Sequence, residues 1–228
     1  MYAARVAQLV ERGAYTSVVA GSSPATRTVM GKQIVVIHGG ETFETYEEYK
    51  EHLHYKELSR EKLKQNPDWK ATLEEQLGEE YDVLLPRMPN KDNARFSEWS
   101  IIFQKVLDIC AEPLVLVGHS LGGVFLAKYL SENTVSNNIE GLILVAAPFE
   151  GSKEESLSDF ILPDSLEQCA EQCTQIALFH STDDPVVPFE QSEKYMRALP
   201  NTKRVTLSEH GHCNNKDFPE LVTYITSL

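Results

Sequence analysis

Cysteine is scarce in this sequence, and the residue spacings of common metal sites are missing. None of the four cysteines forms a C-x-x-C pair, and the histidines do not follow the H-E-x-x-H pattern of zinc enzymes. These absences argue against a dense disulfide framework and against the usual metal motifs. We therefore expect no metal and no cofactor. Thiols that stay reduced favour a cytoplasmic location. The four cysteines are Cys110, Cys169, Cys173 and Cys213.

Positive charge and long hydrophobic runs are scarce as well. The 228 residues include 21 Lys and Arg against 34 Asp and Glu, which gives a formal net charge of −13. Such a charge argues against binding to nucleic acid or to anionic membranes. It also disfavours strongly anionic substrates, unless a local basic patch exists that the sequence does not reveal. No apolar run approaches the roughly 20 residues that a transmembrane helix needs.

Residues 1–29 differ in composition from the rest of the chain. They contain three arginines and one acidic residue, so their net charge is +2 against −15 for the remainder. They lack the continuous apolar stretch of a secretory signal. Their sequence resembles peptides that arise when a transfer-RNA gene is translated. We therefore expect residues 1–29 to be a non-native or disordered extension and residues 30–228 to form a single domain.

From Met30 onward, strand-like apolar runs alternate with helical patterns. Continuous apolar strands separated by helices indicate a mainly parallel sheet that is covered on both faces. The sequence therefore predicts an α/β fold: a compact three-layer α/β/α sandwich with about six strands and no large lid. The expected strands are 34–37, 81–85, 114–117, 142–145, 176–179 and 204–207, and the expected helices are 46–64, 69–77, 96–109, 124–130, 189–199 and 218–228.

The segment 118–122 has the pattern G-x-S-x-G and follows the apolar run 114–117 directly. A helical pattern comes after it. In this context the pattern is typical of a nucleophile elbow, in which a serine occupies a strained turn between a strand and a helix. The sequence therefore predicts that Ser120 is a catalytic nucleophile.

A serine hydroxyl needs a histidine as general base and an acid that orients the histidine. In folds with this elbow, the acid and the histidine follow the serine in that order. Two later loops supply candidates, each directly after an expected strand. We predict that His212 is the base, with His210 as its competitor, and that Asp184 is the acid, although the sequence does not fully separate Asp184 from Asp183.

The same chemistry requires backbone N–H groups that stabilise the oxyanion of the reaction intermediate. One donor is expected at Leu121, the residue after the nucleophile. The other is expected in the loop after the first strand, where Gly40 is the leading candidate and Glu41 its neighbour. For His38 in the same loop, we favour a hydrogen-bonded structural role over a catalytic one.

Together these motifs resemble the α/β-hydrolase superfamily. More narrowly, the chain is similar to small serine hydrolases related to retinoblastoma-binding protein 9 and to bacterial YdeN-like proteins. The resemblance implies a compact sheet, a serine-aspartate-histidine triad and poorly defined natural substrates. A charged insertion around 45–66 departs from the family pattern. The segments that carry the resemblance are 38–40, Trp69, 84–89, Trp99, 118–123, 181–185 and 211–212.

The sequence thus predicts a serine hydrolase of the carboxylesterase type. Its expected substrates are small esters, or thioesters or amides, cleaved through an acyl-serine intermediate. The alternative is a non-catalytic protein-interaction module that keeps the hydrolase fold. A non-hydrolytic use of the same triad is a third possibility. The sequence predicts no nucleic-acid or membrane partner, and it identifies no protein partner.

Overall fold

The fold is built on a six-stranded parallel sheet. The computed structural model describes residues 31–60, 63–64, 67–152 and 156–228, so the expectation for residues 1–29 lies outside the described residues. Within the sheet the strands run in the order β2-β1-β3-β4-β5-β6, and every neighbouring pair is parallel. The predicted α/β class and strand number are confirmed. The strands are β1 (Lys32–Ile37), β2 (Tyr81–Leu84), β3 (Leu114–His119), β4 (Ile139–Val145), β5 (Cys173–Ser181) and β6 (Lys203–Leu207).

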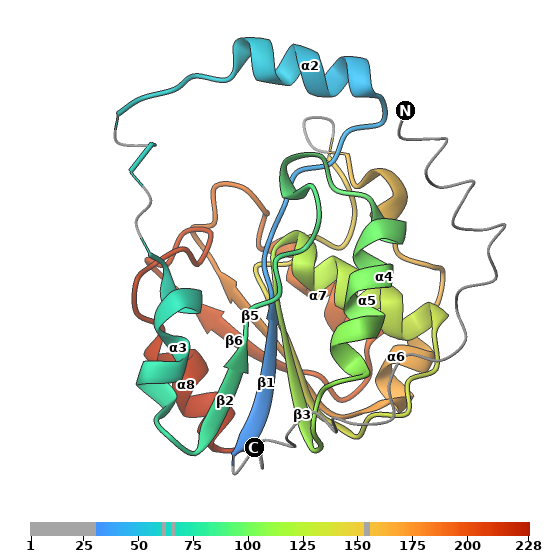
Figure 1. Cartoon of the computed structure of the whole chain (residues 1–228), viewed down its shortest axis with the longest axis vertical. Coiled ribbons are helices and arrows are strands. Elements are labelled where there is room, and N and C mark those ends of the chain that lie inside the picture. The colour runs from blue at the N-terminus through green and yellow to red at the C-terminus, as the bar shows by residue number, and fades with distance from the viewer. Residues whose placement is uncertain (1–30, 61–62, 65–66, 153–155) are drawn as a thin grey trace, which may run out of the picture.

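Helices cover both faces of this sheet (Figure 1). Two of them, α3 and α8, lie on one face, and α4, α5, α6 and α7 lie on the other, while α2 stands apart above the strand ends. The helices are α2 (Tyr46–Tyr55), α3 (Trp69–Leu77), α4 (Phe96–Leu107), α5 (Leu121–Glu132), α6 (Glu167–Glu171), α7 (Glu190–Ala198) and α8 (Pro219–Thr226), and short 3₁₀ turns occupy Lys91–Asn93 and Ser158–Phe160.

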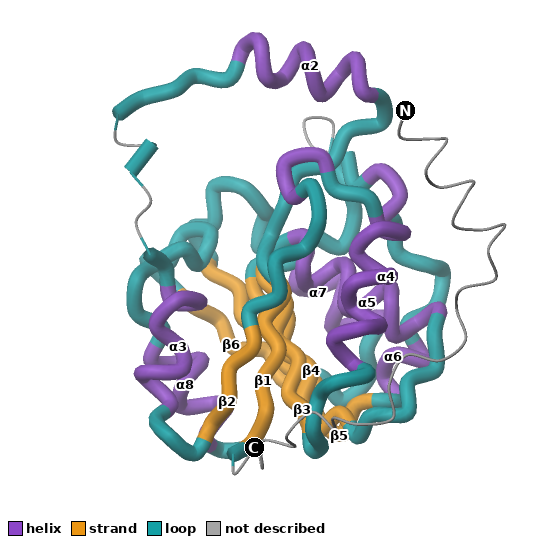
Figure 2. The backbone as a smooth tube through the Cα atoms, in the orientation of Figure 1, coloured by secondary structure: helices purple, strands orange, loops and turns teal. Residues whose placement is uncertain are grey.

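The continuous apolar strands follow from this layering (Figure 2). Successive side chains of a strand point to opposite faces of the sheet. In β1, Ile34 and Val36 pack against the α3 and α8 side, whereas Val35 and Ile37 pack against the α4 and α5 side. Because both faces are covered, both sets of positions are apolar from Ile34 to Ile37.

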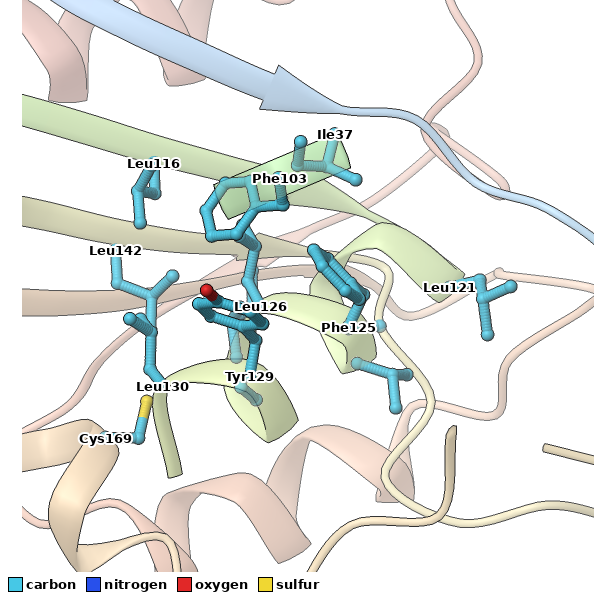
Figure 3. Packing of buried hydrophobic residues seen from close by; sticks show 14 of the residues in the cluster. Ile37, Phe103, Leu116, Leu121, Phe125, Leu126, Tyr129, Leu130, Leu142 and Cys169 are labelled. Atoms are coloured by element: carbon cyan, nitrogen blue, oxygen red, sulfur yellow. The ribbon is translucent and has the colours of Figure 1, made fainter. Parts of the chain in front are cut away.

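Aromatic side chains fill the larger of the two cores. Phe103 of α4 meets Phe125 and Tyr129 of α5 edge to face, with ring centroids 5.3 and 4.9 Å apart. Figure 3 shows these rings beside Leu116 and Leu142 of the sheet. Edge-to-face contacts of this kind add to the gain from burial, and they fix α4 and α5 against β3.

The expected helix over 46–64 is wrong beyond Tyr55, where α2 ends and the described residues 56–60 and 63–64 are not helical. It begins well: Thr45 caps the helix, its side chain accepts from the Glu48 amide, and the Glu48 carboxylate accepts from the Thr45 amide. No residue of α2 is buried, however, and the backbone turns extended at Lys56. A charged segment without a buried face gains too little from packing to extend the helix further.

Candidate active site

Ser120 lies in the turn between β3 and α5. Its backbone has φ 53° and ψ −123°, a region that non-glycine residues rarely occupy. Its amide donates to the Val145 carbonyl at 2.8 Å, which ties the turn to β4. Close packing requires glycine two positions later, because a Cβ on Gly122 would lie 2.6 Å from the His38 carbonyl oxygen. The result is a strained, partly exposed serine above the carboxyl edge of the sheet.

Asp184 follows β5 and points its carboxylate at His212. Its Oδ2 lies 2.9 Å from His212 Nδ1, and its Oδ1 accepts the amides of Val186 and Val187 at 2.8 and 3.0 Å. The carboxylate is fully buried. An ionised acid in this position keeps the proton of His212 on Nδ1, so that Nε2 is left as a proton acceptor.

The neighbouring acid, Asp183, makes different contacts. Its Oδ1 accepts from the Ser181 hydroxyl and, at 3.3 Å, from the Gly211 amide. The Ser181 hydrogen bond is the main reason that the pKa of Asp183 is below its usual value. Asp183 therefore tethers the loop that carries His212, whereas Asp184 contacts the imidazole of His212 itself.

The two histidines of this loop are also distinct. His212 lines a cavity together with Ser120. His210 instead donates from Nδ1 to the Ser208 carbonyl at 2.8 Å, and its Nε2 lies 3.4 Å from Glu220. Both of these partners lie outside the cavity that His212 shares with Ser120.

Two buried side chains that the sequence reasoning left without a role hold the His212 loop. His119, the residue before the serine, donates from Nε2 to the His212 carbonyl at 2.9 Å. Trp69 of α3 donates from Nε1 to the Cys213 carbonyl at 2.8 Å. Burial, with the positive charge of Lys70 as a second cause, places the pKa of His119 well below its ordinary value, so the ring is neutral. Both partners are far away in sequence, and no local motif indicates these contacts.

The two expected oxyanion donors line the same cavity. Leu121 is the first residue of α5, where backbone N–H groups lack partners within the helix. In the β1 loop, Glu41 donates its amide to the Lys91 carbonyl at 2.7 Å. The Gly40 amide has no hydrogen-bond partner among the described residues, and a Cβ at this position would lie 2.6 Å from the Lys91 carbonyl oxygen. Gly40 is therefore the residue of this pair whose amide is available.

His38 is satisfied at both ring nitrogens. Its Nδ1 donates to the Gly39 carbonyl at 2.6 Å, and its Nε2 accepts the Met88 amide at 3.0 Å. Burial is the main cause that lowers the pKa of His38. These contacts match the structural role expected for it.

The cavity above the elbow has a volume of about 620 Å³. Its walls include residues from the loops after all six strands, at the edge where ligands bind in open α/β sheets. The charged insertion also reaches it, because His52 of α2 is one of the lining residues. Over the described ranges, no cluster of three or more His, Cys, Asp or Glu side chains is arranged to hold a metal ion. The helices in those ranges include none with the length and apolar character to cross a bilayer.

Comparison with known proteins places this chain in a family. A family model described as serine hydrolase matches residues 62–220. Serine hydrolase RBBP9 of Rattus norvegicus is 29% identical over 151 residues, which cover 65% of this chain and 78% of that protein. The ydeN gene product of B. subtilis has a TM-score of 0.69 at 21% identity, over 86% of this chain and 97% of the other. An esterase from Exiguobacterium antarcticum has a TM-score of 0.57 at 15% identity, over 86% and 91%. The chain therefore belongs to the serine hydrolase family and has an α/β-hydrolase-like fold.

Proposed function

We propose that this protein hydrolyses small carboxylic esters, and related thioesters or amides, through an acyl-serine intermediate on Ser120. The observation that carries the proposal is the buried contact between Asp184 and His212, in a loop that shares the cavity of the strained serine. The family makes a hydrolase the expected activity. The contacts around the cavity suggest how each residue takes part.

In the first step, Ser120 attacks the ester carbonyl and His212 Nε2 accepts the hydroxyl proton. Asp184 keeps the other ring nitrogen protonated and stabilises the imidazolium that forms. The amides of Gly40 and Leu121 donate to the oxygen on which negative charge develops. His212 then returns the proton to the leaving alcohol, and the acyl-serine remains.

In the second step, a water molecule attacks the acyl-serine while His212 takes one of its protons. The same two amides hold the second oxyanion, and the acid product leaves with Ser120 restored. Every proton in this cycle passes through His212. No other group is required for the bond changes.

Labelling with a neutral alkyl fluorophosphonate tests the proposal, because such a probe reacts with an activated serine. We expect wild-type protein to be labelled and Ser120→Ala not to be. Ser131→Ala is a matched control, because Ser131 lies on α5, the helix that Ser120 precedes, and its hydroxyl donates to the Ala127 carbonyl. It should be labelled as fast as wild type. A panel of 4-nitrophenyl esters of increasing acyl length then measures kcat/KM. A folded wild-type protein that neither labels nor hydrolyses any ester would favour the interaction module instead.

A further inference from the structure

One cation that lines the cavity is much less exposed than the other lysine and the acidic side chains of the lining. Lys70, in the first turn of α3, has a side chain that is only 15% exposed. The other lysine and the acids of the lining are between 43% and 60% exposed, and each belongs to an exposed ion pair at the rim. Those rim residues are Glu41, Lys91, Asp92 and Glu150.

The Lys70 ammonium has N–H donors that are not used by protein partners among the described residues. It lies 2.5 Å from Asp68 Oδ2 and sits 4.9 Å from the centre of the Trp69 ring. Within the part of the chain that the structure describes, Asp68 is its only hydrogen-bond or ion-pair partner. An ammonium group carries three N–H donors, so a single carboxylate does not satisfy it. An incompletely paired charge in a mostly buried position favours the arrival of another anion.

Lys70 lines the cavity that also contains Ser120, so an anion bound to its ammonium would lie in that cavity. Lys70 and His38 line both the main cavity and a smaller neighbouring one of about 430 Å³, whereas Asp68 lines only the smaller one. The positive charge also reaches the elbow, because it contributes to the low pKa of His119, the residue before the nucleophile. Burial lowers the pKa of Lys70 itself, and a bound anion would oppose that effect.

We propose that Lys70 is a substrate-binding residue that recognises a carboxylate on the ester, so that the substrates are monoanionic esters rather than wholly neutral ones. This inference rests on the proposed function, and it adds the class of substrate. The net charge of −13 repels anions in general. Lys70 is a local exception inside the cavity.

The test uses pairs of fluorophosphonates whose alkyl arm ends either in a carboxylate or in its methyl ester. Arms of several lengths are compared, and the readout is the second-order rate constant for labelling. In wild type, we expect the carboxylate probe to react about 10- to 100-fold faster than its ester at the best arm length, as one charge-assisted contact allows. This ratio should fall to about 1 or below in Lys70→Met and should be largely kept in Lys70→Arg.

Two further variants separate recognition from a purely structural ion pair. Asp68→Asn keeps a side chain that can cap α3 but frees the ammonium, so the preference for the carboxylate probe should rise. Lys91→Met removes an exposed cation from the same cavity and should change the ratio by less than about twofold. These two variants also serve if Lys70→Met fails to fold.

The possible failures are distinguishable. If wild type reacts with the neutral probes but shows no preference for carboxylate at any arm length, the role of Lys70 is refuted while the hydrolase proposal stands. A preference that survives Lys70→Met, or that falls in Asp68→Asn, refutes it as well. If no probe labels folded wild-type protein, the proposed function itself fails.

Discussion

Asp184→Asn is the substitution that tests the proposed triad most directly. The carboxylate is fully buried and accepts three N–H groups, from His212 Nδ1 and from the amides of Val186 and Val187. An asparagine oxygen can still accept the two amides. Its NH₂ group would then face Nδ1 and force the imidazole proton onto Nε2. In that tautomer His212 cannot accept a proton from Ser120.

The expected loss in kcat is about 10⁴-fold, as for the same change in other serine-histidine-aspartate triads. This corresponds to about 5.4 kcal/mol of transition-state stabilisation. Stability should change much less. The two amide contacts become hydrogen bonds to a neutral acceptor, which are weaker than those to a charged one, so unfolding should become about 1–3 kcal/mol easier. Catalysis and stability are therefore expected to separate clearly.

Asp183→Asn is the matched control, because it makes the same chemical change one residue earlier. Asp183 contacts the Ser181 hydroxyl and the Gly211 amide rather than the His212 ring. We expect less than a tenfold loss in kcat. The assay is steady-state hydrolysis of the best 4-nitrophenyl ester, with urea unfolding of both variants. The reasoning is refuted if Asp184→Asn retains more than a tenth of the activity, or if Asp183→Asn is the more damaging change.

Three other perturbations follow from the structure. Gly40→Ala should lower kcat about 10²- to 10³-fold, because its Cβ would lie 2.6 Å from the Lys91 carbonyl oxygen and displace the amide; an active variant would exclude that amide as an oxyanion donor. The pKa of His119 is below that of an unfolded histidine, so its contribution to stability is present above about pH 6.5 and is lost as the pH falls. The loss is at most about 1.4 kcal/mol per pH unit. Urea unfolding at several pH values should show that the free energy of unfolding falls less steeply with decreasing pH in His119→Gln than in wild type. Phe125→Ala should destabilise the fold by about 3–5 kcal/mol in thermal or urea unfolding, and a smaller loss would mean that the core collapses around the cavity.

The sheet is predictable from the sequence because each strand is buried on two faces. The run 114–117 has no polar position to offer solvent, and the structure shows why: alternate residues enter the two different cores. Where burial is absent, prediction fails. The charged segment 46–64 has helical composition throughout, yet the helix ends at Tyr55, and none of the segment's described residues is buried. Local propensity is a weak guide without tertiary contacts.

The candidate site divides in the same way. Sequence order and spacing were enough to select Ser120, His212 and a pair of aspartates, because the elbow and the strand ends impose their positions along the chain. They favoured Asp184 but did not fully separate it from Asp183, since adjacent residues of a turn point in different directions and the turn geometry decides which one contacts the imidazole. Nor did they reveal that His119 and Trp69 hold the His212 loop.

By itself, then, the sequence determined the class of fold and the residue types that we propose carry the chemistry. These depend on hydrophobic periodicity and on a local backbone motif, and both can be recognised from neighbouring residues in the sequence. The tertiary structure alone decided which carboxylate contacts His212, which amide of the β1 loop is available, and that the mostly buried Lys70 lines the cavity. Such contacts join residues that are far apart in sequence, so they exist only once the sheet has brought its strand ends together.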